Sequence, residues 1–216
     1  MKILNSFGPN PRMLRMFMLE KNIHIDFQEH DLMGAENRED IYLSKNPGGQ
    51  LPALELDDGT VIAETVVICD YLEEIHPTPS LIGKTPGERA ETRMWTRRVE
   101  QKITENIYAG FRFAEGLQLF ENRVRCIPEA ADGLKAVGQD GLAWLDEQMV
   151  GKNFICGNRI TTADLVLYCC TDFASGVGQP IDATLDNINA WFSTIAARES
   201  AIGSLHPAAE KVGMRG

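Results

Sequence analysis

The sequence predicts an α/β domain followed by an all-helical domain. Apolar residues alternate between strand-like and helix-like spacing over the first 75 residues, a stretch rich in Pro and Gly follows, and only helical spacing recurs beyond it. The chain of 216 residues, 44% of them hydrophobic, is long enough for two hydrophobic cores. We therefore expect one domain over residues 1–76, a linker over 77–87 and a second domain over 88–216.

The first domain opens with a strand, a helix and a second strand. Residues 2–5 form a short apolar run, and residues 12–22 contain no Gly or Pro and place their apolar side chains on one face. Asn10 is a favoured N-cap residue and Pro11 suits the first position of a helix, so we expect Asn10 to cap this helix. Alternation of apolar and polar residues over 23–28 predicts the second strand.

A hairpin and a helix complete this domain. A polar, helical stretch over residues 35–44 leads into a loop at 46–49, which has the turn sequence NPGG. Residues 53–56 and 60–63 flank an Asp-Asp-Gly turn and predict two antiparallel strands. Spacing of i, i+3, i+4 and i+7 predicts a helix over 64–75, which makes the order βαβ and then ββα.

Helices dominate the second domain, which shows no pair of strands with turn chemistry. The helical segments are residues 88–115, 129–150, 161–173 and 187–198.

Composition excludes several classes of function. With 21 Lys and Arg against 31 Asp and Glu, the net charge is −10, which disfavours nucleic acid and anionic membranes as partners. We find no secretory signal and no run of about 18 apolar residues, so we expect a soluble, cytoplasmic protein. The five cysteines form no CxxC motif and should be reduced and buried, and the four histidines lack ligand spacing, so we expect no metal.

The sharpest chemical signal combines Leu51-Pro52 with Glu64-Thr65. A proline at the start of a strand cannot donate to the sheet, and it leaves the N–H and C=O of Leu51 available to a bound peptide. At the start of a helix, free N–H groups and the Thr65 hydroxyl suit a carboxylate, while Glu64 suits an ammonium. Such groups would bind the head group of an amino acid. A plain turn proline and a favourable helix-dipole charge are the alternatives.

Residues 50–74, QLPALELDDGTVIAETVVICDYLEE, resemble the N-terminal domain of glutathione S-transferases. Residues 157–164, GNRITTAD, resemble the signature of the C-terminal domain in that family, in which Thr161 and Asp164 form a capping box that begins a buried helix. The resemblance implies a thioredoxin-like first domain, a cis peptide bond before Pro52, glutathione as substrate and a homodimer.

The resemblance also implies how glutathione would bind. Leu51 would pair through its backbone with the cysteinyl unit, as in strand addition. Glu64 and Thr65 would hold the γ-glutamyl end, and Gln50 would reach the glycyl end.

The group that activates the glutathione thiol departs from the family pattern. Members use a tyrosine after the first strand, or a serine or cysteine just before the helix, whereas here no tyrosine precedes Tyr42 and Gly8 stands at the serine position. Asn10 is the first candidate, because its side-chain N–H would donate to the sulfur and favour the thiolate. Simple helix capping explains Asn10 equally well. Ser6 is the second candidate.

The expected activity is that of a glutathione S-transferase, which activates the thiolate for attack on a hydrophobic electrophile. Two alternatives stay open: a non-catalytic glutathione-binding or regulatory protein, and a glutathione-dependent reductase or peroxidase. Disulfide exchange through a thiolate of the protein itself is disfavoured, because the N-terminal region has no cysteine. Trp95, Tyr108, Phe111 and Phe113 are candidates to line the electrophile pocket, and Glu100 is a candidate to reach across a two-fold dimer interface.

Overall fold

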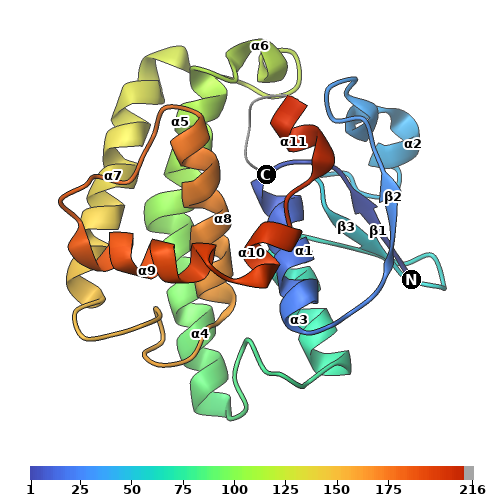
Figure 1. Ribbon diagram of the computed structural model, residues 1–216. Helices are drawn as coiled ribbons and strands as arrows, with labels where there is room; N and C mark the ends of the chain where they lie inside the picture. The colour runs from blue at the N-terminus through green and yellow to red at the C-terminus, as the bar shows by residue number, and fades with distance from the viewer. Residues whose placement is uncertain (212–216) are drawn as a thin grey trace.

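The computed structural model describes residues 1–211 and places a four-stranded mixed sheet in the first domain (Figure 1). Its strands are β1 (Lys2–Asn5), β2 (Asp26–Glu29), β3 (Ala53–Glu55) and β4 (Val61–Ala63), in the spatial order β2-β1-β3-β4. β1 pairs with β2 in parallel and with β3 antiparallel, and β3 pairs with β4 antiparallel. This topology confirms the predicted thioredoxin-like domain.

Helices cover both faces of the sheet. Ile3 and Leu54 are fully buried in one core together with residues of α1 (Pro9–Glu20) and α3 (Thr65–Ile75). Their neighbours along the strands, Leu4 and Ala53, are buried in a separate cluster with Tyr42 of the short helix α2 (Asp40–Leu43). Since successive side chains on a strand point to opposite faces, two short strands supply both cores.

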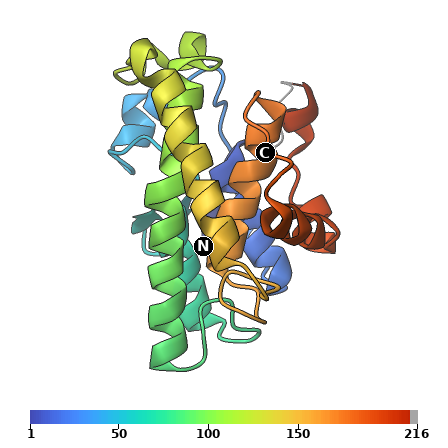
Figure 2. The same ribbon diagram turned by 90° about the vertical axis from the view of Figure 1, so that its left-hand side faces the viewer.

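The second domain is all-helical, as predicted. Its helices are α4 (Pro86–Val99), the π-helix η2 (Glu100–Thr104), α5 (Glu105–Phe113), α6 (Leu117–Phe120), α7 (Ala131–Gln148), α8 (Thr162–Gly176), α9 (Asp186–Ala196), α10 (Glu199–Gly203) and α11 (Pro207–Lys211), with a 3₁₀ turn η3 (Pro128–Ala130) before α7. The continuous run α4–η2–α5 lies beside α7 (Figure 2). α8 lies between that pair and α1 of the first domain (Figure 1).

Several boundaries differ from the prediction. Asn22 has φ 53°, and the N–H of Ile23 bonds to the carbonyl of Met18, which completes the helix terminus. Residues 23–25 belong to no helix or strand, and β2 begins only at Asp26. The stretch 35–44 is divided into a 3₁₀ turn, η1 (Glu36–Arg38), and α2, because Glu39 between them is extended. The segments α6, α10 and α11 were not predicted, since each is only one turn or so long.

The first and second domains are joined by a segment without helix or strand, between Ile75 and Pro86. Pro86 and Gly87, which we had placed in the linker, belong to α4, because Thr85 forms a capping box with Glu88 and proline suits the first helical position. We propose that the domains divide at this segment.

Arg12 of α1 ties the two domains together. Its side chain is fully buried and forms an ion pair with Asp172 of α8. The same guanidinium donates to the hydroxyl of Tyr168 at 3.5 Å and to the carbonyl of Ala201 at 3.1 Å. A buried cation requires such partners. These bonds hold α1, and with it the loop before it, against the second domain.

Glu73 of α3 holds the connecting segment in place. Its carboxylate pairs with Lys21 at 2.6 Å and accepts hydrogen bonds from the Ser80 hydroxyl at 2.7 Å and from the N–H groups of Leu81 and Ile82 at 3.0 and 3.1 Å. Burial by itself would raise the pKa of Glu73, but these hydrogen bonds lower it below its ordinary value.

We expect Glu73→Gln to lower the free energy of unfolding by about 2 kcal/mol at pH 7 and to weaken its dependence on acid pH. Because the folded-state pKa of Glu73 is lowered, its contribution is present above the unfolded pKa of about 4.3 and is lost as pH falls below it. Urea denaturation at pH 7 and pH 3.5 measures both effects. Glu74→Gln, at the exposed neighbouring position, is the control. An acid dependence that is the same in both variants would contradict the assignment.

Within residues 1–211, no helix combines the length and apolar character needed to cross a membrane. The five cysteines are free thiols; four are buried as predicted, and Cys126 is half-buried. In the same part of the chain, His, Cys, Asp and Glu side chains form no group of three or more that could hold a metal ion.

Candidate active site

One edge of the sheet brings three loops together. Leu4 of β1 lies opposite Ala53 of β3, and Ala53 lies opposite Ala63 of β4. The chain that leaves β1, the chain that enters β3 and the chain that leaves β4 therefore meet at the same edge. These three loops lead to or contain five of the residues predicted to act on a ligand, namely Asn10, Gln50, Leu51, Glu64 and Thr65.

Two adjoining pockets open at this edge. The first, called the polar pocket below, contains five of the six predicted site residues: Asn10, Gln50, Leu51, Glu64 and Thr65. Its opposite wall is formed by α4, η2 and α5, which contribute Arg97, Glu100, Thr104 and Glu105.

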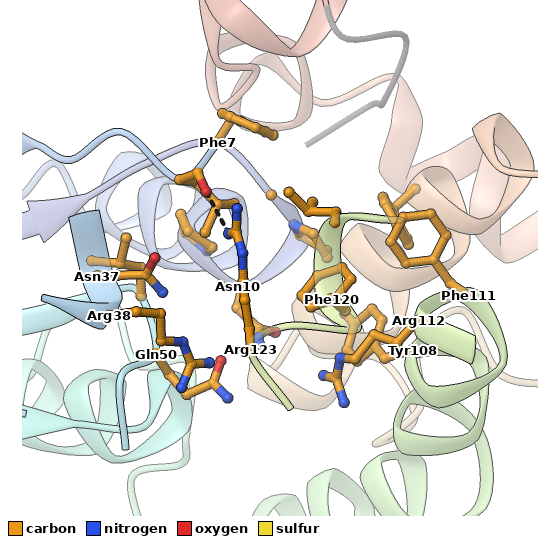
Figure 3. Close-up of a pocket in the computed structure, with 17 residues that line it drawn as sticks. Phe7, Asn10, Asn37, Arg38, Gln50, Tyr108, Phe111, Arg112, Phe120 and Arg123 are labelled. Carbon is orange, nitrogen blue, oxygen red and sulfur yellow. Dashed lines mark hydrogen bonds between the residues drawn. The ribbon is translucent and has the colours of Figure 1, made fainter. Parts of the chain in front are cut away.

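The second pocket, called the apolar pocket, holds about 850 Å³ of empty space open to solvent. Its apolar lining includes Phe7, Leu32, Phe111, Leu119, Phe120 and Phe173. Figure 3 shows Asn37, Arg38 and Gln50 of the first domain on one side of this pocket and the aromatic residues of the second domain on the other. The two pockets share a wall formed by Asn10, Gln50, Leu51, Tyr108 and Arg112.

Leu51 lines the polar pocket and has backbone groups without hydrogen-bond partners. The peptide bond between Leu51 and Pro52 is cis, and strand β3 begins only at Ala53. Among residues 1–211, no hydrogen-bond partner is found for the N–H or the C=O of Leu51. The carbonyl of Gln50, just before it, is held by the hydroxyl of Tyr42 at 2.5 Å and the amide of Asn46 at 2.9 Å. The loop is thus fixed while the backbone of Leu51 stays available to a ligand.

Glu64 is the N-cap of α3, which begins at Thr65. The sequence had predicted Glu64 to be the first residue of this helix. The Glu64 φ of 68° is in a region that residues other than glycine rarely adopt. The first bond of the helix runs from the N–H of Ile68 to the carbonyl of Glu64, and the side chain of Glu64 makes no capping bond. The N–H groups of the first turn therefore remain without partners inside the helix, which suits an anion.

Asn10 does not cap α1, so this prediction is wrong. Gly8 is the N-cap, with φ 126° and ψ 164°, a conformation essentially confined to glycine, and Pro9 is the first helical residue. No side chain makes a capping bond at this end. Because Pro9 and Pro11 have no N–H, the first turn offers only the backbone N–H and the side-chain amide of Asn10 as donors. The Asn10 side chain is exposed and lines both pockets.

Ser6, the second candidate, lies outside the lining of both pockets. Its side chain is buried, with 2% of the residue exposed, and its hydroxyl donates to the carbonyl of His30 at 2.9 Å. The Ser6 proton is therefore already engaged within the first domain.

The aromatic candidates of the second domain are only partly in the site. Tyr108 and Phe111 line the apolar pocket, whereas Phe113 does not. Trp95 is buried elsewhere, with its ring 5.9 Å from that of Trp144. Tyr108 lies beside Cys170; burial, with that thiol as a further cause, raises the pKa of Tyr108 well above its usual range, so its phenol stays neutral.

Charged residues of the site were largely missed by sequence reasoning. Arg38, Arg112 and Arg123 line the apolar pocket, and their separation along the chain leaves no local signal for such a cluster. Glu100, considered only as a dimer contact, lies in the wall of the polar pocket of its own chain. Burial raises the pKa of Glu100, and Arg97 counteracts this effect.

Comparison with known proteins agrees with this arrangement. Residues 7–75 match the family described as glutathione S-transferase, N-terminal domain, and residues 129–199 match the glutathione S-transferase C-terminal domain. The chain is 28% identical to glutathione S-transferase 2 of Saccharomyces cerevisiae over 200 residues, which cover 89% of this chain and 84% of that protein. It is 31% identical to GstA of Escherichia coli O157:H7 over 164 residues, which cover 76% and 75%.

Solved structures show the same likeness. A glutathione S-transferase domain-containing protein of Marinobacter aquaeolei VT8 superposes with a TM-score of 0.87 at 35% identity, covering 93% of this chain and 99% of that one. Gtt2 of Saccharomyces cerevisiae superposes with a TM-score of 0.89 at 27% identity, covering 95% and 100%. Because its fold, the family matches of both domains and these relatives agree, the chain belongs to the glutathione S-transferase superfamily.

Proposed function

We propose that this protein is a glutathione transferase that binds glutathione in the polar pocket and activates its thiol beside Asn10. The observation that carries the proposal is that three features line this one pocket: Leu51 with its unpaired backbone, the first turn of α3 at Glu64-Thr65, and Asn10.

Each part of glutathione has a complementary group. The γ-glutamyl carboxylate suits the free N–H groups of α3 and the hydroxyl of Thr65, and its ammonium suits Glu64. The cysteinyl unit would pair with the backbone of Leu51. The glycyl carboxylate would extend toward Gln50 and Arg38, which lie together on one side of the apolar pocket (Figure 3).

Asn10 would stabilise the thiolate. A thiol with a pKa of about 8.5 is only a few per cent ionised at pH 7, and lowering that pKa by two units requires about 2.7 kcal/mol. A hydrogen bond donated to a charged acceptor contributes about 1.5–3 kcal/mol. The thiolate would then form a bond to the electrophilic carbon with its lone pair, the leaving group would depart with the electrons of the broken bond, and the thiol proton would pass to solvent.

The apolar pocket would hold a hydrophobic electrophile next to the sulfur, since both pockets share Asn10 in their common wall. No cysteine is among the residues that line either pocket, which disfavours a reductase that forms a mixed disulfide with its own thiol. A homodimer formed through α4 and a cytoplasmic location remain part of this proposal.

Isothermal calorimetry with glutathione tests the proposal through Thr65→Val. We expect the variant to bind glutathione about tenfold or more weakly, because it lacks one hydroxyl donor to the carboxylate. Thr60→Val removes the same hydroxyl from the exposed turn between β3 and β4 and should bind like the parent chain. Absence of binding to the parent chain, or equal binding to both variants, would contradict the proposal. Binding without turnover of any electrophile would favour the non-catalytic alternative.

A further inference from the structure

The apolar pocket carries three arginines in a chain whose net charge is −10. Arg38 comes from η1 in the first domain, Arg112 from α5, and Arg123 from the segment after α6. Cations of this kind around an aromatic pocket are unexpected for a site that takes only neutral hydrophobic molecules.

Two of these arginines already have hydrogen-bond partners. Arg123 donates to the carbonyls of Leu32 and Met33 at 2.6 and 2.8 Å and so connects the second domain to the first (Figure 3). Arg38 makes a long bond of 3.4 Å to the carbonyl of Gly48 and lies beside Gln50, where the glycyl carboxylate is proposed.

Arg112 has no comparable partner. Among the residues whose side chains are described, none forms an ion pair or hydrogen bond with Arg112, and its guanidinium instead lies 5.9 Å from the ring centre of Phe120. The side chain is half-buried, and burial lowers the pKa of Arg112, with the Arg38 cation as a further cause. A half-buried cation without a counter-charge has lost part of its hydration, and a bound anion would offset that cost.

The position of Arg112 points to the second substrate. It lies in the wall shared by both pockets, together with Asn10. The adjoining rings of Phe111, Phe120 and Phe173 meet edge to face at 6.1 and 5.0 Å, which suits a flat apolar body. Both carboxylates of glutathione already have proposed donors, at α3 and at Gln50 with Arg38, so Arg112 is left for another anion.

We infer that the electrophile is an aromatic or conjugated molecule bearing a carboxylate, which Arg112 binds while the ring packs against Phe111 and Phe120. The reactive carbon then faces the sulfur beside Asn10. This inference rests on the proposed function and adds the chemical class of its second substrate.

Two glutathione conjugates that differ only in charge test the inference. They are S-(4-carboxy-2,6-dinitrophenyl)glutathione and its 4-carbamoyl counterpart, both titrated by calorimetry at pH 7. We expect the parent chain to bind the carboxylate at least about tenfold more tightly than the amide. Arg112→Gln should bring this ratio close to one, and any effect common to both ligands cancels in the ratio.

Arg98→Gln is the matched control, because it removes the same charge from α4, where Arg98 lies over the ring of Trp95 outside both pockets. It should keep the preference for the carboxylate.

In turnover by the parent chain, 4-chloro-3,5-dinitrobenzoate should have a higher kcat/KM than 4-chloro-3,5-dinitrobenzamide. In both reactions the sulfur replaces chloride, which leaves with the electrons of the C–Cl bond.

Equal affinity of the parent chain for both conjugates would overturn the inference, whatever the behaviour of the variants. An undiminished ratio in Arg112→Gln, or a loss shared equally by both conjugates, would overturn it as well, and glutathione binding would still support the proposed function. If neither conjugate nor glutathione binds the parent chain, the proposed function fails and the inference fails with it.

Discussion

Replacing Asp164 with alanine should lower the free energy of unfolding by about 3–6 kcal/mol, the largest effect on stability that we expect in this chain. The carboxylate is fully buried at the start of α8 and accepts four hydrogen bonds: from the N–H and hydroxyl of Thr161 at 2.8 and 2.9 Å, from the N–H of Ile155 at 2.9 Å, and from the indole of Trp191 at 3.0 Å. Alanine leaves three buried N–H donors without an acceptor.

Urea denaturation followed by tryptophan fluorescence measures this loss, and Trp191 reports the site directly. Asp164→Asn should fall between the parent chain and Asp164→Ala, because its single oxygen cannot accept what two oxygens accept now. Asp186→Ala, in the exposed first turn of α9, should change stability by less than about 0.5 kcal/mol. A small effect of Asp164→Ala would contradict the role of this carboxylate as the anchor of α8.

Replacing Asn10 with aspartate should reduce kcat/KM at pH 7 by about a hundredfold, the largest effect on activity that we expect. The substitution removes the side-chain donor and puts a negative charge where the thiolate forms, and both changes raise the pKa of the bound thiol. Asn10→Ala removes only the donor, so its thiol pKa should rise by about one unit and the loss at pH 7 should be about tenfold.

The dependence of kcat/KM on pH shows whether a raised thiol pKa causes the loss of activity. For Asn10→Ala the rate should recover as pH rises toward 9, since the thiol then ionises without help. Stability should change little, because the side chain makes no capping bond to α1. Asn153→Asp adds the same charge at an exposed position outside both pockets and should leave the profile unchanged. A loss of stability with an unshifted profile would instead indicate a structural role for Asn10.

Local sequence determined the order of the elements and the motifs that begin them. The βαβ-ββα order and the helical second domain were predicted from spacing, because each element needs an apolar face of its own period. The capping box of Thr161 and Asp164 was also predicted, since its bonds join residues three positions apart. Glu64-Thr65 was recognised for the same reason, as a helix start next to a hairpin.

Only the tertiary structure decided which of these residues share a site. Sequence spacing shows that Trp95 and Phe111 are apolar and helical, but the packing of α4–η2–α5 against α7 and α8 places one in the core and the other in the pocket. Gly8, not Asn10, is the N-cap of α1. The chain turns out of β1 at this position with a backbone conformation essentially confined to glycine, so the helix begins at Pro9. Arg112 lines the same pockets as Asn10 only because α5 lies opposite the sheet edge. The two residues are about a hundred positions apart in the chain, so no local pattern records that they share a site.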